Sequence, residues 1–485
     1  MKILVVASEA VPFIKTGGLG DVVGALPKAL ARMGHDVKVF IPRYDGLSLG
    51  YHQAHSLPWS DAIAISGKKH SMSVDVVRER KIPLEYYFVR NDHYFRREGV
   101  YRDEANGTDY ADNNERFVFF SRAVLKTVRE VGWKPDVIHA HDWQASLIPS
   151  YLATELKDDP FFTKTKTVLT IHNLAFQGTF EKEEFDSLGL PKEHFFPTAP
   201  FEFWGKVNFL KAAIVHADKI TTVSERYADE IQTEEHGCGL EGVLKERKED
   251  LVGILNGVDY TVWSPSRDKK IPFNYYPANL SGKRMNKVEL LNEFGLPVRD
   301  RTPLIGVISR LSDQKGFDLF AEIADDVFGL DVQMIVLGTG DEVYHDLFAS
   351  LQKKYPDKMK AYLGFDDALA HRIEAASDIF LMPSRFEPCG LNQMYSLKYG
   401  TVPIVREVGG LADTVTDFNP AINQGTGFVF GEYSSEALLE TIKRAVALYS
   451  KKRVWTRLMK AGMALDYSWD RAARKYADLF ERIVG

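Results

Sequence analysis

One segment near the start of the chain combines a cation with closely spaced glycines: Lys15-Thr-Gly-Gly-Leu-Gly-Asp21. Apolar residues at helical spacing follow it, so we expect a helix to begin within it. Backbone N–H groups and the positive dipole end of a helix attract an anion there, and the missing Cβ atoms of Gly17 and Gly18 let the anion come close. A tight connection with an incidental lysine would contain the same residues. The spacing is neither G-x-G-x-x-G nor a Walker motif, which disfavours a dinucleotide enzyme.

Two further cations, Arg310 and Lys315, lie in Ser309-Arg-Leu-Ser-Asp-Gln-Lys-Gly316, directly after an apolar run. Two fixed cations on such a loop suit a diphosphate leaving group, because negative charge develops on it as its bond breaks. A solvated basic loop paired with Asp313 is the alternative. Gly316 at the start of the next predicted helix favours anion binding.

A carboxylate and a thiol stand together in Pro383-Ser-Arg-Phe-Glu-Pro-Cys-Gly-Leu391. Glu387 lies between a predicted strand and a predicted helix, where it would serve either as a favourable helix cap or as a group that holds sugar hydroxyls or stabilises a positive anomeric carbon. The local pattern leaves both roles open. Cys389 is interpreted as a small packing residue, since no base-orienting pattern accompanies it.

Histidines follow two other predicted strands, in His139-Ala-His-Asp-Trp143 and in His172-Asn173. Their spacing is unlike that of the common helical zinc motifs, so a metal site is disfavoured. Polar groups next to Trp143, Phe176 and Gln177 instead indicate a carbohydrate surface, in which aromatic faces contact sugar rings.

Strands that alternate with helices must position these groups. Short, continuous apolar runs predict strands buried on both faces of parallel sheets, whose ligands bind beyond the carboxyl ends of the strands. The first series of runs covers 3–7, 37–41, 136–139, 167–171 and 219–223, and the second covers 252–255, 304–309, 332–337, 361–363, 379–382, 402–405 and 427–430. The sequence therefore predicts two Rossmann-like doubly wound α/β domains, 1–252 and 253–463, with a linker over roughly 256–280 and a final amphipathic helix over 469–483.

Composition fits a soluble two-domain protein. The 485 residues carry 61 basic and 67 acidic side chains, a balance that excludes a generic basic nucleic-acid binder. Two cysteines are too few for a disulfide framework, no apolar run reaches the ~20 residues of a membrane span, and residues 3–7 do not continue as a signal peptide. We therefore expect a cytoplasmic protein without nucleic-acid or membrane partners.

The ordered set of motifs resembles the bacterial-type glycogen synthases of the starch synthase family, from end to end. The matching segments are Lys15-Thr-Gly-Gly-Leu19, Asp109-Tyr-Ala-Asp-Asn113, His139-Ala-His-Asp-Trp-Gln144, 170–178, 222–228, 253–259, Ser309–Gly316, Arg385-Phe-Glu-Pro-Cys-Gly-Leu391 and Gly409-Gly-Leu-Ala-Asp-Thr414. One of these motifs alone would be weak, but their shared order is highly specific.

The resemblance implies a glycosyltransferase B fold, in which two Rossmann-like domains face each other across a cleft and the C-terminal helix (464–485) returns to the N-terminal domain. It implies transfer of glucose from ADP-glucose to the non-reducing 4-hydroxyl of an α-1,4-glucan such as glycogen or a malto-oligosaccharide, with retention of configuration. UDP-glucose is the alternative donor. Neither a metal nor pyridoxal phosphate is expected as a cofactor.

The resemblance also assigns roles to particular residues. The implied catalytic residues are His172, Arg310, Lys315 and Glu387. The implied donor-binding residues are Lys15, Gly17, Gly18, Asp142, Asn173, Asn256, Tyr362, Cys389, Gly390 and Leu391. Weaker candidates for the acceptor side are Glu9, Asp21, Tyr94 and Phe95.

Tyr395 marks a departure from wider relatives, many of which place a second glutamate eight residues after the first. Catalysis by two carboxylates is thereby disfavoured. Same-face attack and a short-lived covalent or ion-pair state both remain open as routes to retention. A glycan phosphorylase with lysine-bound pyridoxal phosphate and an inactive glucan-binding scaffold are the rival functions.

Overall fold

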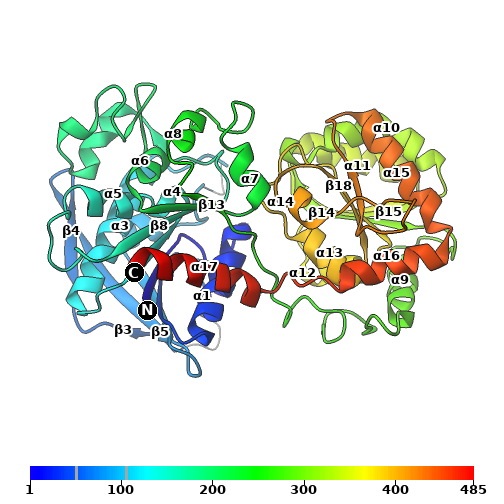
Figure 1. Ribbon diagram of the computed structural model, residues 1–485, viewed down its shortest axis with the longest axis horizontal. Helices are drawn as coiled ribbons and strands as arrows, with labels where there is room; N and C mark the ends of the chain where they lie inside the picture. Colours follow the sequence, from blue (N-terminus) through cyan, green and yellow to red (C-terminus); the bar gives the residue numbers. More distant parts are fainter. Residues whose placement is uncertain (50–52, 104–106) are drawn as a thin grey trace. The chain divides into compact units, whose positions relative to one another are not determined.

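The computed structural model describes residues 1–49, 53–103 and 107–485. The chain forms two compact units, one made of Met1–Gly257 and Trp469–Gly485 and the other of Val258–Ser468. Each unit contains a sheet of mainly or entirely parallel strands with helices around it (Figure 1). Both chain ends lie in the first unit. The prediction of two Rossmann-like α/β domains is confirmed.

The sheet of the first unit combines a parallel body with an antiparallel edge. Its parallel strands are, in spatial order, β13 (Leu251–Gly253), β12 (Lys219–Thr222), β8 (Lys166–Ile171), β7 (Val137–His141), β1 (Lys2–Val6), β2 (Asp36–Pro42) and β6 (Leu84–Arg90). β5 (Lys68–Arg78) pairs antiparallel to β6, and β3 (His55–Ser56) and β4 (Asp61–Ile65) pair with β5. Residues 3–6 of β1 are completely buried, as a strand covered on both faces requires.

Helices and a small second sheet cover this body. The helices are α1 (Gly18–Arg32), α2 (Asp92–Phe95), α3 (Asn113–Glu130), α4 (Asp142–Ala145), α5 (Leu147–Ala153), α6 (Phe209–His216), α7 (Glu225–Glu230), α8 (Glu241–Glu246) and α17 (Trp469–Val484), with 3₁₀ turns at Lys182–Leu188 and Lys192–His194. Strands β9 (Thr179–Phe180), β10 (Glu202–Phe203) and β11 (Lys206–Asn208) form the small sheet. The amphipathic α17 lies against α1 and buries Ala473, Tyr476 and Phe480 (Figure 1).

The sequence predicted that the run Val252–Leu255 begins a second series of strands, and this prediction is wrong. β13 (Leu251–Gly253) pairs with β12 and is the last strand of the first sheet. Residues 258–280 then contain no helix or strand, and all of them are described. A short apolar run indicates a strand but does not indicate which sheet receives it.

The sheet of the second unit is entirely parallel. Its strands are, in spatial order, β16 (Met359–Leu363), β15 (Gln333–Gly340), β14 (Leu304–Leu311), β17 (Ile379–Met382), β18 (Val402–Arg406) and β19 (Phe428–Phe430). Its helices are α9 (Ser281–Glu293), α10 (Phe317–Gly329), α11 (Glu342–Lys354), α12 (Asp367–Ala376), α13 (Asn392–Tyr399), α14 (Gly409–Thr414), α15 (Ser435–Tyr449) and α16 (Lys452–Met463), with a 3₁₀ turn at Asp313–Lys315.

Strand order places a crevice in each sheet. The chain moves outward from β14 through β15 to β16 and then returns to the other side of β14 with β17, so the order reverses between β14 and β17. The same reversal occurs between β1 and β7 in the first unit. Ligands of doubly wound sheets bind beyond the carboxyl ends of strands at such points.

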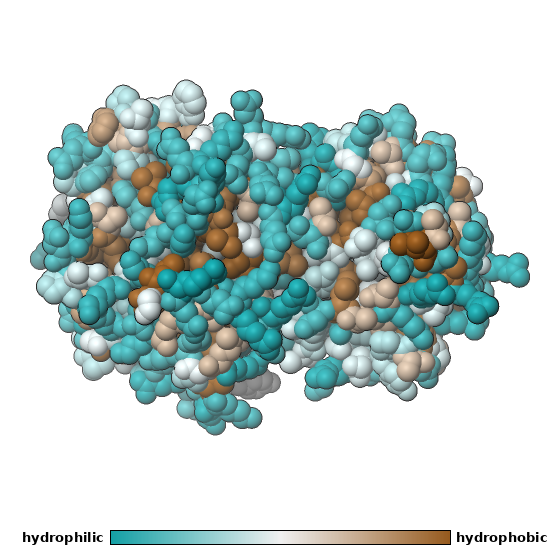
Figure 2. Space-filling model, viewed as in Figure 1, coloured by the Kyte–Doolittle hydropathy of each residue, from teal (hydrophilic) through white to brown (hydrophobic). Residues whose placement is uncertain are grey.

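Hydrophilic residues predominate on the face shown in Figure 2, where apolar residues lie in small groups. Among the helices of the described residues, none has both the length and the apolar composition that crossing a membrane requires.

Candidate active site

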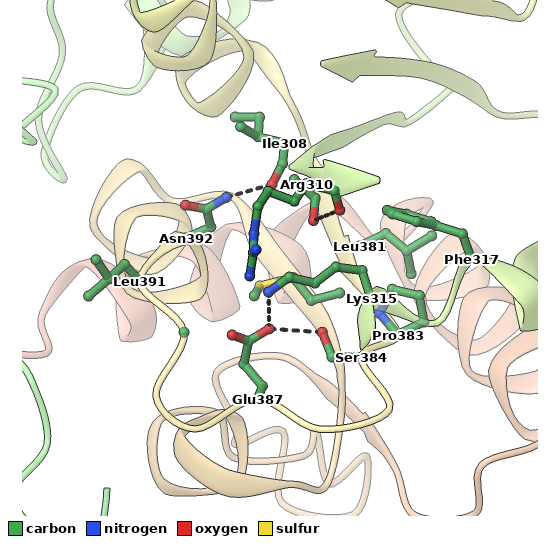
Figure 3. A pocket seen from close by; sticks show the side chains of 13 residues that line it. Ile308, Arg310, Lys315, Phe317, Leu381, Pro383, Ser384, Glu387, Leu391 and Asn392 are labelled. Carbon is green, nitrogen blue, oxygen red and sulfur yellow. Dashed lines mark hydrogen bonds and ion pairs between the residues drawn. The ribbon is translucent and has the colours of Figure 1, made fainter. Parts of the chain in front are cut away.

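A cavity of about 160 Å³ opens in the second unit where β14 and β17 end. Arg310 and Lys315 line it from the segment that follows β14, and Glu387, Gly390 and Leu391 line it from the segment between β17 and α13 (Figure 3). Residues more than 70 positions apart in the sequence therefore meet at the reversal of strand order.

An ion pair forms the centre of this cavity. Lys315 Nζ lies 2.6 Å from Glu387 Oε2, and the Ser384 hydroxyl donates to the same oxygen at 3.0 Å. The Lys315 and Glu387 side chains are only 17% and 8% exposed, so the pair is largely shielded from water. The Arg310 side chain points toward the same space (Figure 3) and makes no ion pair with any residue that the structure describes. The cavity thus presents one paired and one unpaired cation to an incoming anion.

Close backbone packing fixes the loop that carries Glu387. At the start of α14, a Cβ atom on Gly409 would lie 2.0 Å from the Glu387 carbonyl oxygen, and one on Gly410 would lie 2.1 Å from the Cys389 carbonyl oxygen. The buried Gln393 amide donates to the carbonyl oxygens of Cys389 and Gly390, each at 3.0 Å. The backbone around Cys389, Gly390 and Leu391 is therefore held from two sides.

Gly316, in the loop after β14, packs closely against the loop that begins at Pro383, and its substitution tests this contact. Its φ is +72°, and an added Cβ would lie 1.9 Å from the Pro383 carbonyl oxygen. We expect Gly316→Ala to lower the free energy of unfolding by at least about 2 kcal/mol, from left-handed backbone strain and this clash. Urea denaturation measures the effect. Gly329→Ala is the control, because its Cβ meets open space; equal midpoints for both variants would contradict the prediction.

In the first unit, Glu9 holds the glycine-rich loop. Its carboxylate accepts the Thr16 N–H and hydroxyl and the Gly17 N–H, while Tyr101 donates to Oε1 at 2.7 Å. Lys15 forms an ion pair with Asp21 at 2.7 Å at the start of α1. Cβ atoms on Gly17 and Gly18 would meet no protein atom within 4 Å. The loop therefore leaves open space at the helix N-terminus, next to a cation.

A row of histidines lies where β7 and β8 end. His141 Nδ1 is 2.9 Å from His172 Nε2, and His139 Nε2 is 2.6 Å from the Thr170 hydroxyl. The backbone N–H of His172 donates to Asp142 Oδ1 at 2.7 Å.

Burial lowers the pKa of His139 and of His172 to about 3, and burial lowers the pKa of His141 well below its ordinary value. Burial raises the pKa of Asp142 to about 7, helped by the Glu9 charge. The histidines are thus neutral at pH 7, when they can hydrogen-bond but add no positive charge.

These buried histidines make stability depend on pH. The pKa of His139 is 6.5 in the unfolded chain and about 3 in the folded one, so below pH 6.5 the unfolded state binds a proton that the folded state does not. The free energy of unfolding falls as the pH drops, by about 2 kcal/mol at pH 5 for such a shift. We expect His139→Gln to flatten this dependence, measured by denaturation at pH 7.5 and pH 5. Lost packing against α17 lowers stability equally at both pH values, so an unchanged slope would contradict the prediction.

The remaining predicted site residues do not line the cavity around Lys315 and Glu387. Asn173 Oδ1 accepts the Ala175 N–H at 3.1 Å, and the buried Asn256 has an Oδ1 atom without a partner among the described residues. Tyr362 lies on β16 and is 44% exposed. Tyr94 and Phe95 are completely buried, which contradicts direct contact with an acceptor. The sequence shows an aromatic pair but does not indicate that both rings, at the end of α2, point into the core.

Sequence reasoning did not single out Ser384, Gln393 or Tyr101 as groups that hold the site. Ser384 precedes Glu387 by three residues, a spacing that could have suggested the contact. Among the residues that the structure describes, no three His, Cys, Asp or Glu side chains form a group that could hold a metal ion.

Two family models match the chain. Residues 2–246 match the starch synthase catalytic domain, and residues 291–458 match glycosyl transferases group 1. The first match covers the β1, β7 and β8 ends, and the second covers the cavity around Lys315 and Glu387.

Relatives align over nearly the whole chain. The chain is 47% identical to a glycogen synthase of Koribacter versatilis over 99% of its own length and 98% of that protein, and 47% identical to one of Anaeromyxobacter dehalogenans over the full length of both. Among solved structures, the catalytic domain of starch synthase IV from Arabidopsis thaliana, bound to ADP and acarbose, superposes with a TM-score of 0.90 at 33% identity over 99% of both chains. The chain therefore belongs to the starch synthase family of glycosyltransferases, which includes the bacterial glycogen synthases.

Proposed function

We propose that this protein is an ADP-glucose-dependent glycogen synthase of the cytoplasm. It transfers glucose, with retention of configuration, to the non-reducing 4-hydroxyl of glycogen or a malto-oligosaccharide and releases ADP. The observation that carries the proposal is the cavity in which Arg310, Lys315 and Glu387 converge where β14 and β17 end. Support comes from relatives described as glycogen synthases and from a similar starch synthase that was solved with ADP.

Residues of the second unit bind the donor in this proposal. Arg310 and Lys315 bind the diphosphate and stabilise its charge as it leaves. Glu387 and the backbone of residues 389–391 hold the glucose hydroxyls, and Tyr362 covers the base. Lys315 is already paired with Glu387 at 2.6 Å, so a single ammonium would contact both the sugar-binding carboxylate and the phosphate. Cationic side chains thus neutralise the diphosphate, without a metal or pyridoxal phosphate as cofactor.

Residues of the first unit complete the proposal. Lys15 and the Gly17-Gly18 turn lie against the diphosphate at the N-terminus of α1. His172 contacts the donor sugar as a neutral imidazole, and Asp142, Asn173 and Asn256 lie against the same sugar. Glu9 acts by holding the loop at Thr16 and Gly17, and Asp21 by positioning Lys15.

The proton balance of the transfer needs no second carboxylate. The bond from the anomeric carbon to the β-phosphate oxygen breaks, and the acceptor 4-hydroxyl oxygen bonds to the same face of that carbon. A phosphate oxygen accepts the proton of that hydroxyl, so ADP leaves with it. Tyr395, eight residues after Glu387, has no carboxylate to offer for a double displacement.

A competition assay tests the function. Equal concentrations of ADP-glucose and UDP-glucose, each with a different glucose label, are incubated with glycogen, and ADP, UDP and both labels in the polymer are measured. We expect ADP release to match label transfer from ADP-glucose, into linkages that β-amylase removes. Preferential transfer from UDP-glucose would overturn the donor assignment. Absence of transfer from both donors would favour a scaffold, and glucose 1-phosphate formation from glycogen and phosphate would favour a phosphorylase.

A further inference from the structure

The second unit contains another cavity, of about 460 Å³, between α9 and α16. Asp378 contributes to its lining and accepts the N–H of Leu304 at 2.9 Å. Leu304 is the first residue of β14, and Asp378 directly precedes β17. This cavity therefore lies at the amino ends of the two strands whose carboxyl ends carry the proposed donor site, and the two cavities share no lining residue.

The lining of this second cavity is strongly cationic. Six of its residues are lysines or arginines and two are aspartates: Lys283, Arg284, Lys287, Arg299, Arg301 and Lys452 against Asp300 and Asp378. Burial lowers the pKa of Lys283 to about 7, so the excess of positive charge comes mainly from the other five. The chain as a whole has a net charge of −6, so the excess is local. A concave site lined by one sign of charge concentrates ligands of the opposite sign.

Half of these cations already have partners. Lys287 bonds to Asp378 Oδ2 at 2.6 Å, Lys283 bonds to the Thr401 hydroxyl at 2.7 Å, and Arg284 pairs with Asp300 at 2.9 Å. Neither Arg299 nor Arg301 has a side-chain hydrogen bond or ion pair with any residue in 1–49, 53–103 or 107–485. Two guanidinium groups two positions apart in the sequence are thus available to an oxyanion, which they can bind in a bidentate manner.

On α16, Lys452 adds a further cation to the cavity and Trp455 adds a wall. The Lys452 ammonium lies 3.2 Å from the centre of the Tyr449 ring and forms no ion pair among the described residues. Burial lowers the pKa of Lys452, an effect that a bound anion would reverse. Trp455 lines the cavity, is 2% exposed, and has an Nε1–H without an acceptor in the described chain. Because this nitrogen is itself closed off from solvent, Trp455 contributes part of the cavity wall rather than a donor to a ligand.

The volume and lining of this second cavity indicate which class of ligand it can bind. Cavities of ~300–1,000 Å³ hold metabolite-sized molecules. Apolar side chains, Leu291 and Val298 among them, contribute walls that a bare phosphate ion would not need. We propose that this cavity binds a sugar phosphate, with Arg299, Arg301 and Lys452 on the phosphate and the sugar against the apolar walls.

Isothermal titration calorimetry with fructose 6-phosphate tests this proposal. Saturating ADP is present throughout, so that the proposed donor site is filled. We expect saturable binding to the wild-type protein, at least ~10-fold weaker binding to the Arg299→Ala/Arg301→Ala double variant, and none of unphosphorylated fructose. Arg453→Ala/Arg457→Ala is the matched control, because it removes two exposed charges of α16 that do not line the cavity.

The outcomes separate this site from the proposed function. Binding that persists in Lys315→Ala supports a site independent of the donor cavity, and binding lost in that variant overturns the proposal. Equal affinities for wild type and the Arg299/Arg301 variant also overturn it, as does the absence of saturable binding of both fructose 6-phosphate and ribose 5-phosphate to the wild type. Inorganic phosphate that binds as tightly as the sugar phosphates refutes the contribution of the sugar.

Discussion

Lys315→Ala is expected to lower kcat/KM for ADP-glucose by at least ~10²-fold, the cost of a lost electrostatic group at a leaving diphosphate. Two effects combine. The ammonium no longer offsets the charge that develops on the β-phosphate, and Glu387, only 8% exposed, loses the cation 2.6 Å away. An unpaired carboxylate in a shielded cavity also repels the incoming diphosphate. Initial rates of ADP release over a range of ADP-glucose concentrations measure the loss.

Lys354→Ala is the matched control for this variant. Lys354 pairs with Asp325 at 2.7 Å on the exposed surface of the same unit, where an ion pair contributes little. We expect its kcat/KM to stay within about twofold of wild type. Arg310→Ala, which removes the other cation of the cavity, should resemble Lys315→Ala. A near-normal rate in both cavity variants would refute the assignment of these cations to the leaving group.

Glu387→Gln is expected to reduce kcat by about 10³-fold while ADP still binds. The amide keeps the size of the side chain and can accept from the Ser384 hydroxyl, 3.0 Å away in the wild type. It lacks the negative charge that would stabilise a positive anomeric carbon. Because Lys315 is released from its partner, we expect ADP to bind with equal or higher affinity. Calorimetry with ADP and initial rates with ADP-glucose and glycogen measure the two effects.

The control for this variant is Glu342→Gln, which neutralises an exposed carboxylate on α11. Its rate and its ADP affinity should both match wild type. Turnover by Glu387→Gln above a tenth of the wild-type rate would show that the charge is dispensable. A strong loss of ADP affinity would instead place Glu387 against the nucleotide.

Most of the parallel framework was predictable, because a continuous apolar run such as 379–382 is typical of a strand buried on both faces. The placement of Glu387 after such a strand followed from the same pattern. Its pairing with Lys315, 72 residues earlier, did not. That contact depends on β17 lying beside β14, and strand order is set by the whole unit rather than by any local pattern.

The less predictable parts depend on contacts between distant segments. The family resemblance made Glu9 a candidate for the acceptor side, but it did not indicate that Tyr101, 92 residues later, and the adjacent loop would hydrogen-bond to its carboxylate. The antiparallel edge strands β3 to β5 and the parallel strand β6 beside them were not predicted. The burial of Tyr94 likewise depends on a distant segment, because its ring packs against Phe119 on α3.

A crystal structure of the protein with ADP tests the central claim, that side-chain cations of the β14–β17 cavity stabilise the departing diphosphate. The account predicts β-phosphate oxygens within hydrogen-bond distance of Lys315 Nζ and of the Arg310 guanidinium. A diphosphate that contacts neither cation, whether it lies beside Arg299 and Arg301 or is held by a bound metal ion, would contradict it.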